Sequence, residues 1–286
     1  MHSIIARTFL FAACLFMAMA NAAEPARKPP LILAVHPYLP RDEIILRFTP
    51  LAKYIARSIG QPVEVRVGRD YTEHINAIGT DSVDIAYMGA SSYVAMVAKY
   101  GKKPLLARQV AGDPPFLKGE IFVRKDSQLR TLADLKGKQF CFGDRHSTEG
   151  YILPLAMLER AGVPLSNLAG YTNITGHKNV AMAVLACDCD AGAIKDEVFQ
   201  EFAPRGLRSL DGLPLVADHV IVASAKLPAS LATRLRSAIF KLNELPEGKE
   251  IMRSIHSKMT ALVSPKDSDY DSLRAIMQAA APDNAR

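Results

Sequence analysis

The sequence contains no tryptophan, and beyond residue 23 it has no apolar stretch approaching the roughly 20 residues that cross a bilayer. It has no run of lysine or arginine and no interleaving of basic with aromatic residues, so a nucleic-acid partner is not expected. His-Glu-x-x-His, P-loop, dinucleotide and Gly-x-Ser-x-Gly motifs are also missing. We therefore expect a protein that is not an enzyme and that holds no metal ion or cofactor.

Residues 1–23 have the pattern of a secretory signal peptide. A short basic segment ends at Arg7, a largely apolar stretch follows, and small residues come next. We predict cleavage near Ala22 or Ala23 and export to the periplasm. A membrane anchor is the first alternative, but the apolar stretch is short for one. Lipidation of Cys14 is the second, although this cysteine lies inside the apolar stretch.

The charge and the cysteines say less about function. The net charge of +6 would produce a modest positive field that steers an anion. Cys141, Cys187 and Cys189 would remain after cleavage, and an oxidising compartment permits one disulfide and one free thiol. Two alternatives stay open: Cys141 forms a disulfide with Cys187 or Cys189, or all three cysteines are small buried residues without a bridge. Their spacing does not match a zinc site.

Strands and helices alternate along the chain in two blocks, as in α/β proteins with parallel sheets. In the first block we expect strands at 31–35, 63–67 and 83–87 and helices at 42–59, about 71–79 and about 91–100. In the second block we expect strands at 138–142, 168–172 and 189–194 and helices at 147–161 and 177–186. A strand at 220–223 and helices at about 228–243 and 267–280 follow.

We interpret this order as two α/β lobes joined by two chain crossings near 108–124 and 215–223, with the C-terminal helices returning to the first lobe. The alternative is two independent domains on one linker, but neither join has a flexible composition. The expected division is a signal peptide at 1–23, a discontinuous lobe 1 at 24–115 and 221–286, and lobe 2 at 116–220.

Polar residues gather at three points where a strand gives way to a helix: 88–93, 142–151 and 175–177. Ligands of open α/β sheets bind at the carboxyl ends of strands, and helix N-termini offer free N–H groups to anions. Each candidate also has a structural interpretation. Ser91 and Ser147 suit helix N-caps, His177 suits an interior histidine, and Tyr38 and Tyr93 suit a core.

These segments resemble the periplasmic phosphate/phosphonate-binding proteins of ABC transporters, the PhnD-like family, over about residues 31–245. The similar stretches are VHPY (35–38), FTPLAKY (48–54), DIAYMGASSYV (84–94), LADLKGKQFCFGDRHSTEGYIL (132–153) and HKNVAMAVLACDCDAGAI (177–194). The resemblance implies a type II periplasmic-binding-protein fold, a venus-flytrap that holds an anion between its lobes. It implies ligand contacts from Tyr38, Ser91, Ser92 and Tyr93 in one lobe and from Ser147, Thr148 and His177 in the other.

Glu149 departs from the family pattern, because the resemblance places a serine there. A carboxylate about 4 Å from a bound anion would weaken binding by about 4 kcal/mol per charge pair, roughly a thousandfold. We include Glu149 among the site residues under three hypotheses. It pairs with the cationic part of a zwitterionic ligand, it is neutralised by Lys195 or Arg145, or it points away from the site.

The resemblance implies a monomeric periplasmic solute-binding protein that captures a small oxyanion, phosphonate-like or phosphate-like, for a membrane ABC permease. An alternative is a sensory module that presents the bound solute to a two-component histidine kinase. A third possibility is a sensor that holds a soft metalloid oxyanion on Cys187 or Cys189.

Overall fold

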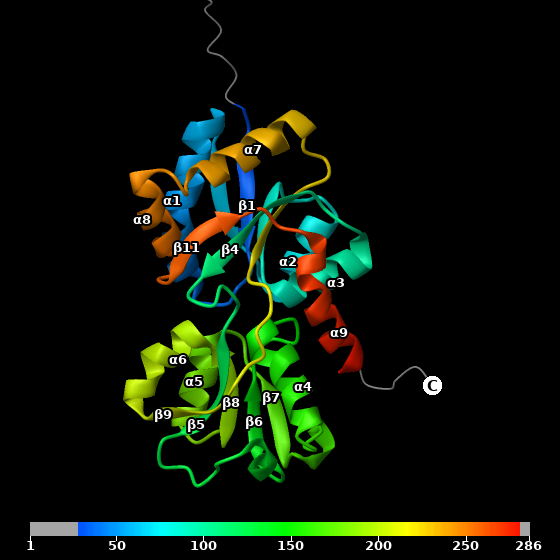
Figure 1. The fold of residues 1–286 in the computed structure, drawn as a ribbon, viewed down its shortest axis with the longest axis vertical. Coiled ribbons are helices and arrows are strands. Elements are labelled where there is room, and N and C mark those ends of the chain that lie inside the picture. Colours follow the sequence, from blue (N-terminus) through cyan, green and yellow to red (C-terminus); the bar gives the residue numbers. More distant parts are fainter. Residues whose placement is uncertain (1–27, 281–286) are drawn as a thin grey trace, which may run out of the picture.

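The computed structural model describes residues 28–280 and shows two α/β lobes, one above the other in Figure 1. The predicted signal peptide lies outside the described residues. The upper lobe contains a sheet with the strand order β11 (Met259–Val263), β4 (Leu105–Ala111), β10 (Val220–Ala223), β3 (Ile85–Met88), β1 (Leu31–Val35) and β2 (Val63–Val67). The lower lobe contains a sheet with the order β7 (Gly170–Asn173), β6 (Gln139–Phe142), β8 (Ala191–Lys195), β5 (Gly119–Arg124) and β9 (Leu207–Gly212).

Both sheets are mixed, which corrects the expectation of wholly parallel sheets. The predicted strands β2, β1 and β3 are parallel, as are β7, β6 and β8. However, β10 runs antiparallel to β3 and β4, and β5 runs antiparallel to β8 and β9. Each of these strands receives the chain from the other lobe. It enters its sheet at the edge where the neighbouring parallel strands end, so it must run in the opposite direction.

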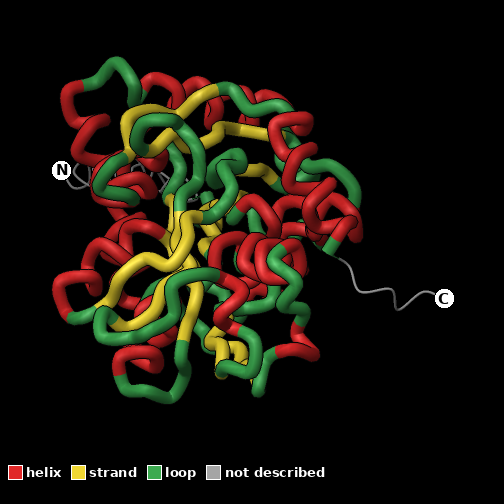
Figure 2. The backbone as a smooth tube through the Cα atoms, turned by 60° about the horizontal axis from the view of Figure 1, so that its bottom comes forward, coloured by secondary structure: helices red, strands yellow, loops and turns green. Residues whose placement is uncertain are grey.

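Helices cover both faces of each sheet (Figures 1 and 2). In the upper lobe α1 (Arg41–Ile59), α7 (Ala229–Lys241) and α8 (Pro246–Ile255) cover one face, and α2 (Tyr71–Gly79), α3 (Ala90–Tyr100) and α9 (Asp271–Ala279) the other. In the lower lobe α5 (His177–Leu185) and α6 (Asp196–Phe202) cover one face, and α4 (Leu153–Arg160), preceded by the π-helical turn η2 (Thr148–Ile152), the other. Sequence reasoning did not predict α6, α8, β9 or β11.

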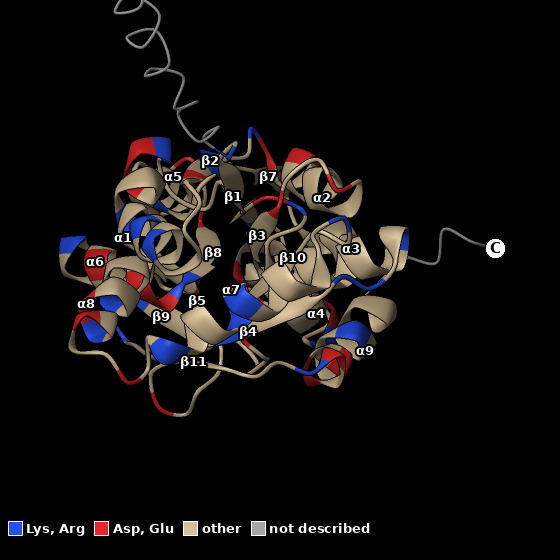
Figure 3. Ribbon diagram, turned by 90° about the horizontal axis from the view of Figure 1, so that it is seen from above, with Lys and Arg blue, Asp and Glu red and all other residues tan. Residues whose placement is uncertain are grey.

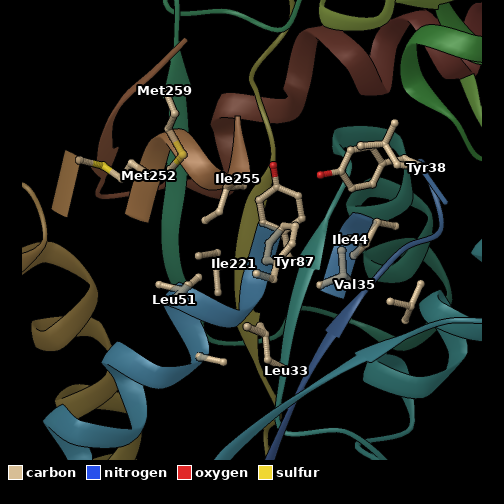
Figure 4. Packing of buried hydrophobic residues seen from close by; sticks show 14 of the residues in the cluster. Leu33, Val35, Tyr38, Ile44, Leu51, Tyr87, Ile221, Met252, Ile255 and Met259 are labelled. Carbon is tan, nitrogen blue, oxygen red and sulfur yellow. The ribbon is translucent and has the colours of Figure 1, made fainter. Parts of the chain in front are cut away.

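The apolar run of β1 is explained by this double covering. Leu33 and Val35 belong to the same apolar cluster as Leu51 of α1 and Met252 of α8 (Figure 4), whereas Ala34 belongs to the cluster on the α2–α3 side. A strand buried on both faces must be apolar at successive positions rather than at alternate ones. The short apolar strands therefore form the cores, and the polar positions fall at the strand ends.

Two chain segments cross between the lobes side by side. Residues 112–118 connect β4 to β5, and residues 213–219 connect β9 to β10. An antiparallel bridge joins them, in which the Leu117 N–H donates to the Val216 carbonyl at 3.0 Å. We propose that the lobe boundaries lie within these crossings, close to the 116–220 range expected for lobe 2.

The C-terminal helix differs from its expected position. It was expected to return to the first lobe, but α9 packs against both α3 of the upper lobe and α4 of the lower lobe. Figure 1 shows it beside both. None of the helices within residues 28–280 has the length and apolarity needed to cross a membrane.

The structure pairs Cys141 with Cys189, whose Cα atoms are 5.8 Å apart. The bridge ties β6 to the start of β8, two neighbouring strands of the lower sheet. Cys187 is free and exposed. Of the alternatives left open by the sequence, the structure therefore selects one disulfide and one free thiol.

Candidate functional site

Three helix N-termini take part in contacts between the two lobes. The start of α3 in the upper lobe bonds to η2 in the lower lobe, and the start of α5 in the lower lobe bonds to Tyr38 of the upper lobe. Gly89 is the N-cap of α3, so Ser91 lies in the first turn and is not the cap. Ser147 is the N-cap of η2, and its hydroxyl accepts a hydrogen bond from the Gly150 N–H at 3.0 Å. The capping interpretation therefore holds for Ser147 and not for Ser91.

Ser91 and Thr148 connect the two lobes directly. The Ser91 N–H donates to Thr148 Oγ1 at 3.0 Å, and the Ser91 hydroxyl donates to the His146 carbonyl at 2.6 Å. The two hydroxyl oxygens are 2.8 Å apart, and since the Ser91 proton is already used, the Thr148 hydroxyl is the donor between them. Ser92 adds a longer bond to the same His146 carbonyl, at 3.3 Å.

Tyr38 and His177 also meet at the interface between the lobes. The His177 N–H donates to the Tyr38 carbonyl at 3.4 Å, and both side chains are buried. Figure 4 shows the Tyr38 hydroxyl directed toward the same space as the hydroxyl of Tyr87 on β3. The interface thus brings together Tyr38, Ser91, Ser92, Ser147, Thr148 and His177.

Tyr93 is the predicted site residue that the structure places elsewhere. Its hydroxyl donates to Asp267 Oδ1 at 2.8 Å, and its ring packs on Tyr270 with centroids 4.8 Å apart. The reason is helical geometry: at about 100° per residue, two positions of α3 separated by two residues point about 200° apart. Ser91 faces the other lobe, so Tyr93 faces the core beneath the C-terminal segment.

A cavity of about 30 Å³ lies between the lobes beside the two crossings. Its lining includes nine polar or charged residues: Gln109, Lys118, Glu149, Lys195, Asp196, Asp218, His219, His256 and Lys258. A space of this size holds about one or two water molecules. A phosphonate-sized molecule therefore requires the lobes to separate or these side chains to move.

Asp218 is fixed by a chain of hydrogen bonds. The Tyr87 hydroxyl donates to Gln109 Oε1 at 2.6 Å, and Gln109 Nε2 donates to Asp218 Oδ2 at 3.2 Å. Asp218 Oδ1 accepts from the His219 N–H at 2.7 Å and lies 2.8 Å from His219 Nδ1. Burial alone would raise the pKa of Asp218, but these bonds to His219 lower it, so Asp218 remains ionised.

Lys195 supplies the buried positive charge at the site. It ends β8, its Nζ lies 4.7 Å from the centroid of the Tyr38 ring, and it pairs with Glu197 at 3.3 Å. Arg47 of the upper lobe pairs with the same carboxylate at 3.0 Å. Burial acts to lower the pKa of Lys195, but Glu197 and other nearby acids raise it above its ordinary value. Lys195 is therefore a permanent cation at the inner edge of the cleft.

Glu149 lines the cavity, so the hypothesis that it points away is wrong. The residue is only 6% exposed, and burial raises the pKa of its carboxyl against the opposing effects of His219 and Lys195. Lys195 forms its ion pair with Glu197, and Arg145 is exposed. Within residues 28–280 Glu149 has no ion-pair partner within 4 Å.

Several histidines surround this region in the neutral form. Burial lowers the pKa of His177 to about 3 and that of His256 to about 4, and it lowers the pKa of His36 well below its ordinary value. The rings of His36 and His219 are stacked with centroids 5.3 Å apart. Across residues 28–280 no three His, Cys, Asp or Glu side chains are grouped closely enough to share a metal ion.

Sequence reasoning missed several residues that line the cavity, among them Gln109, Asp218 and His219. It named Lys195 only as a possible partner of Glu149, although a basic residue directly after the apolar strand AGAI marks a strand end. Asp218 and His219 lie on the second crossing, and Gln109 lies on β4. None of the three lies at the start of a helix, which was the signal used to choose site residues. Their position depends on the second crossing of the chain, which brings 213–219 beside 112–118.

The fold and this site define a class: two-lobed binding proteins whose ligands are held between the lobes. A family described as "ABC transporter, phosphonate, periplasmic substrate-binding protein" matches residues 33–270, and the chain belongs to this family. The chain is 24% identical to the "Phosphate-import protein PhnD" of Mycolicibacterium smegmatis, with 93% of each chain covered. It is 25% identical to the "Phosphonates-binding periplasmic protein" of Escherichia coli, covering 73% of this chain and 65% of that protein.

Solved structures with the same fold include a binding protein of an ABC phosphonate transporter from Pseudomonas aeruginosa, with a TM-score of 0.80, 21% identity, and 88% of this chain and 87% of that chain covered. PhnD1 from Prochlorococcus marinus in complex with methylphosphonate has a TM-score of 0.77 at 21% identity, with 87% and 97% covered. A histidine kinase sensor domain is more distant, with a TM-score of 0.57 at 16% identity, covering 84% and 99%. This last likeness concerns the fold alone and does not favour the sensory alternative.

Proposed function

We propose that this protein captures a phosphonate or phosphate-like oxyanion between its lobes in the periplasm and delivers it to the membrane permease of an ABC importer. Two observations support the proposal: the start of α3 is bonded across the lobes to Thr148 of η2, and the buried ammonium group of Lys195 lies against Tyr38, whose carbonyl accepts the N–H of His177 at the start of α5. Helix N-termini and hydroxyl groups supply N–H and O–H donors to an oxyanion, and the ammonium supplies the countercharge.

The proposed ligand contacts come from both lobes. Tyr38, Ser91 and Ser92 act from the upper lobe, and Ser147, Thr148, His177 and Lys195 act from the lower lobe. In the structure, hydroxyl and N–H groups of Ser91 and Thr148 bond to each other across the interface. When an anion enters, these donors exchange their mutual bonds for bonds to its oxygens, and closure of the lobes then depends on the ligand.

The rest of the proposal concerns processing and chemistry. The signal peptide is removed near Ala22 or Ala23, and the mature protein acts as a monomer. The bound solute is released unchanged, because the protein serves as a carrier and not as a catalyst. Mass spectrometry of the ligand recovered after incubation tests this point: a chemically altered ligand would contradict it.

Calorimetric titration tests the binding function. Protein purified from the periplasm and refolded to remove bound solutes is titrated with phosphate, phosphite, methylphosphonate and 2-aminoethylphosphonate. We expect at least one of these to bind, and Lys195→Gln to weaken that binding about 10- to 100-fold, as for loss of a hydrogen bond to a charged group. The matched control is Lys136→Gln, which removes an exposed lysine of the lower lobe that does not line the cavity. Equal affinity in Lys195→Gln and the wild type would contradict the proposal.

A further inference from the structure

Of the carboxyl groups that line the cavity, those of Asp218 and Glu149 have opposite environments. Asp218 accepts hydrogen bonds from Gln109 Nε2 and from the His219 N–H, and its Oδ1 lies 2.8 Å from His219 Nδ1. Within the described part of the chain, no side-chain donor bonds to the Glu149 carboxylate. When the environments of two carboxyl groups in one site give them different pKa values, the two groups take different roles. The hydrogen bonds to Asp218 keep it ionised and occupy its oxygens. The carboxylate oxygens of Glu149 receive no such hydrogen bond from a side chain within residues 28–280 and are free to accept one from a ligand.

The position of Glu149 is held by the fold. Gly119 on β5 packs against it so closely that a Cβ on this residue would lie 3.1 Å from Glu149 Cβ and 2.8 Å from the Ile194 carbonyl. Ser147 caps the turn η2 that carries Glu149, which fixes the direction in which the side chain leaves the backbone. The carboxylate therefore stays at the cavity and has little freedom to swing into solvent.

A carboxylate fixed in this place cannot accept a fully ionised oxyanion as a neighbour, because neither group carries a proton to share. An oxyanion that retains a P–OH group is different, since that group donates a hydrogen bond to the carboxylate. Building on the proposed function, we propose that Glu149 selects for protonated phosphorus oxyanions, accepting a hydrogen bond from their P–OH group and excluding sulfonate and sulfate. The shared chemistry is a tetrahedral P–OH, present in both phosphonates and phosphate.

Other titratable groups line the cavity with Glu149. They are Lys195 from β8, Lys118 from the first crossing, Asp218 and His219 from the second crossing, Asp196 from α6, and His256 and Lys258 from the end of α8 and the loop after it. Tyr71 from α2 is buried near Glu149 and Asp144, and its burial and both acids raise the pKa of its hydroxyl. The pKa of Lys195 is raised and that of Asp218 lowered, so neither changes charge near neutral pH.

The test compares pairs of ligands with similar shape, of which the phosphorus compound can carry a P–OH group and the sulfur compound has no corresponding proton. The wild-type protein, Glu149→Gln, Glu149→Ser and the control Glu159→Gln, on the exposed side of α4, are titrated at pH 7 with methylphosphonate, methanesulfonate, inorganic phosphate and sulfate. We expect the wild type and the control to prefer each phosphorus ligand over its sulfur counterpart at least 100-fold, since an unmet buried acceptor gives strong rejection. Glu149→Gln is uncharged and adds an N–H donor that can bond a fully ionised oxygen, so it should reduce the preference at least tenfold. Comparing methylphosphonate with phosphate identifies which P–OH source the site favours.

The pH dependence provides a second readout. If the ligand is bound with its proton, wild-type affinity for methylphosphonate falls about tenfold per pH unit above the second pKa of the free ligand, and Glu149→Gln shows a smaller decline. Thermal melts of the two Glu149 variants verify that they are folded before titration.

The outcomes separate the two proposals. Binding of methylphosphonate and methanesulfonate with equal affinity, or an unchanged preference in both Glu149 variants, overturns the role of Glu149 and leaves the binding function standing. Binding of 2-aminoethylphosphonate more than 100-fold tighter than methylphosphonate also overturns it, because Glu149 would then serve an ammonium group. Failure of every phosphorus ligand to bind any of the proteins overturns the proposed function and this inference together.

Discussion

Glu197 provides the sharpest test of the electrostatics of the cleft. Its carboxylate receives Lys195 from its own lobe at 3.3 Å and Arg47 from the other lobe at 3.0 Å. Burial acts to raise the pKa of Glu197, but Lys195, His256 and Arg47 together lower it from 4.5 to about 2. Because one pKa unit corresponds to about 1.4 kcal/mol, this environment favours the ionised carboxylate by about 3 kcal/mol.

The sign of the pH effect follows from that lowered pKa. The stabilisation is complete above pH 4.5, where the unfolded chain is also ionised, and it is lost as the pH falls toward 2. Glu197→Gln should therefore lower the free energy of unfolding by about 3 kcal/mol at pH 7 and should remove this part of the loss in acid. Urea titrations of both proteins between pH 2 and 7 measure the difference.

The control for this experiment is Glu247→Gln, which breaks an exposed pair with Arg57 at 3.1 Å. Exposed pairs contribute about 0–1 kcal/mol, so this variant should remain close to the wild type at every pH. If Glu197→Gln and Glu247→Gln lose the same small amount of stability, or if the acid limb of the curve is unchanged in Glu197→Gln, the assignment of a buried three-charge cluster is refuted.

Three further predictions follow from the fold. Replacing both Cys141 and Cys189 by alanine should reduce the free energy of unfolding by about 4 kcal/mol, because the bridge closes a loop of 48 residues and so lowers the entropy of the unfolded chain. A loss below about 1 kcal/mol in a denaturant titration would contradict this. Gly119→Ala should cost about 1–3 kcal/mol and weaken ligand binding, because its Cβ would lie 2.7 Å from Leu213 and 3.1 Å from Glu149; unchanged melting and affinity would count against the packing described here. Since burial lowers the pKa of His177 to about 3, its ring should stay neutral from pH 8 to 5. The free energy of unfolding should fall as the pH drops below 6.5, because the unfolded chain then binds a proton at this histidine and the native state does not. An NMR titration of this ring with a midpoint near 6.5 would contradict the prediction.

The parallel cores of both lobes were predictable from sequence because their signals are local. The apolar runs of β1, β3 and β6 and the helical spacing of α1 need no knowledge of distant residues. The missed strand β11 pairs with β4, about 150 residues earlier in the chain, and its pattern is only partly buried. An edge strand of this kind forms because it pairs with a strand far away in the sequence, and the local sequence does not reveal that partner.

The site shows the same division between local and distant signals. Ser91, Ser147 and Thr148 were found because helix N-termini after strands are recognisable in the sequence. Tyr93 was included by its position beside Ser91, although the turn of α3 directs it toward Tyr270 and away from the cleft. Lys195 was named from the sequence as a possible partner of Glu149, but its contact with the Tyr38 ring of the other lobe depends on the folded chain.

The bridged pair of crossings limits how the two halves can move. The two segments lie side by side and are bonded between Leu117 and Val216, and we expect them to bend together more easily than they twist, because a twist would shear the bond between them. Opening should then follow largely one hinge direction. Ser91 would meet Thr148 in the same register at each closure, and the closed shape offered to a membrane partner would be constant.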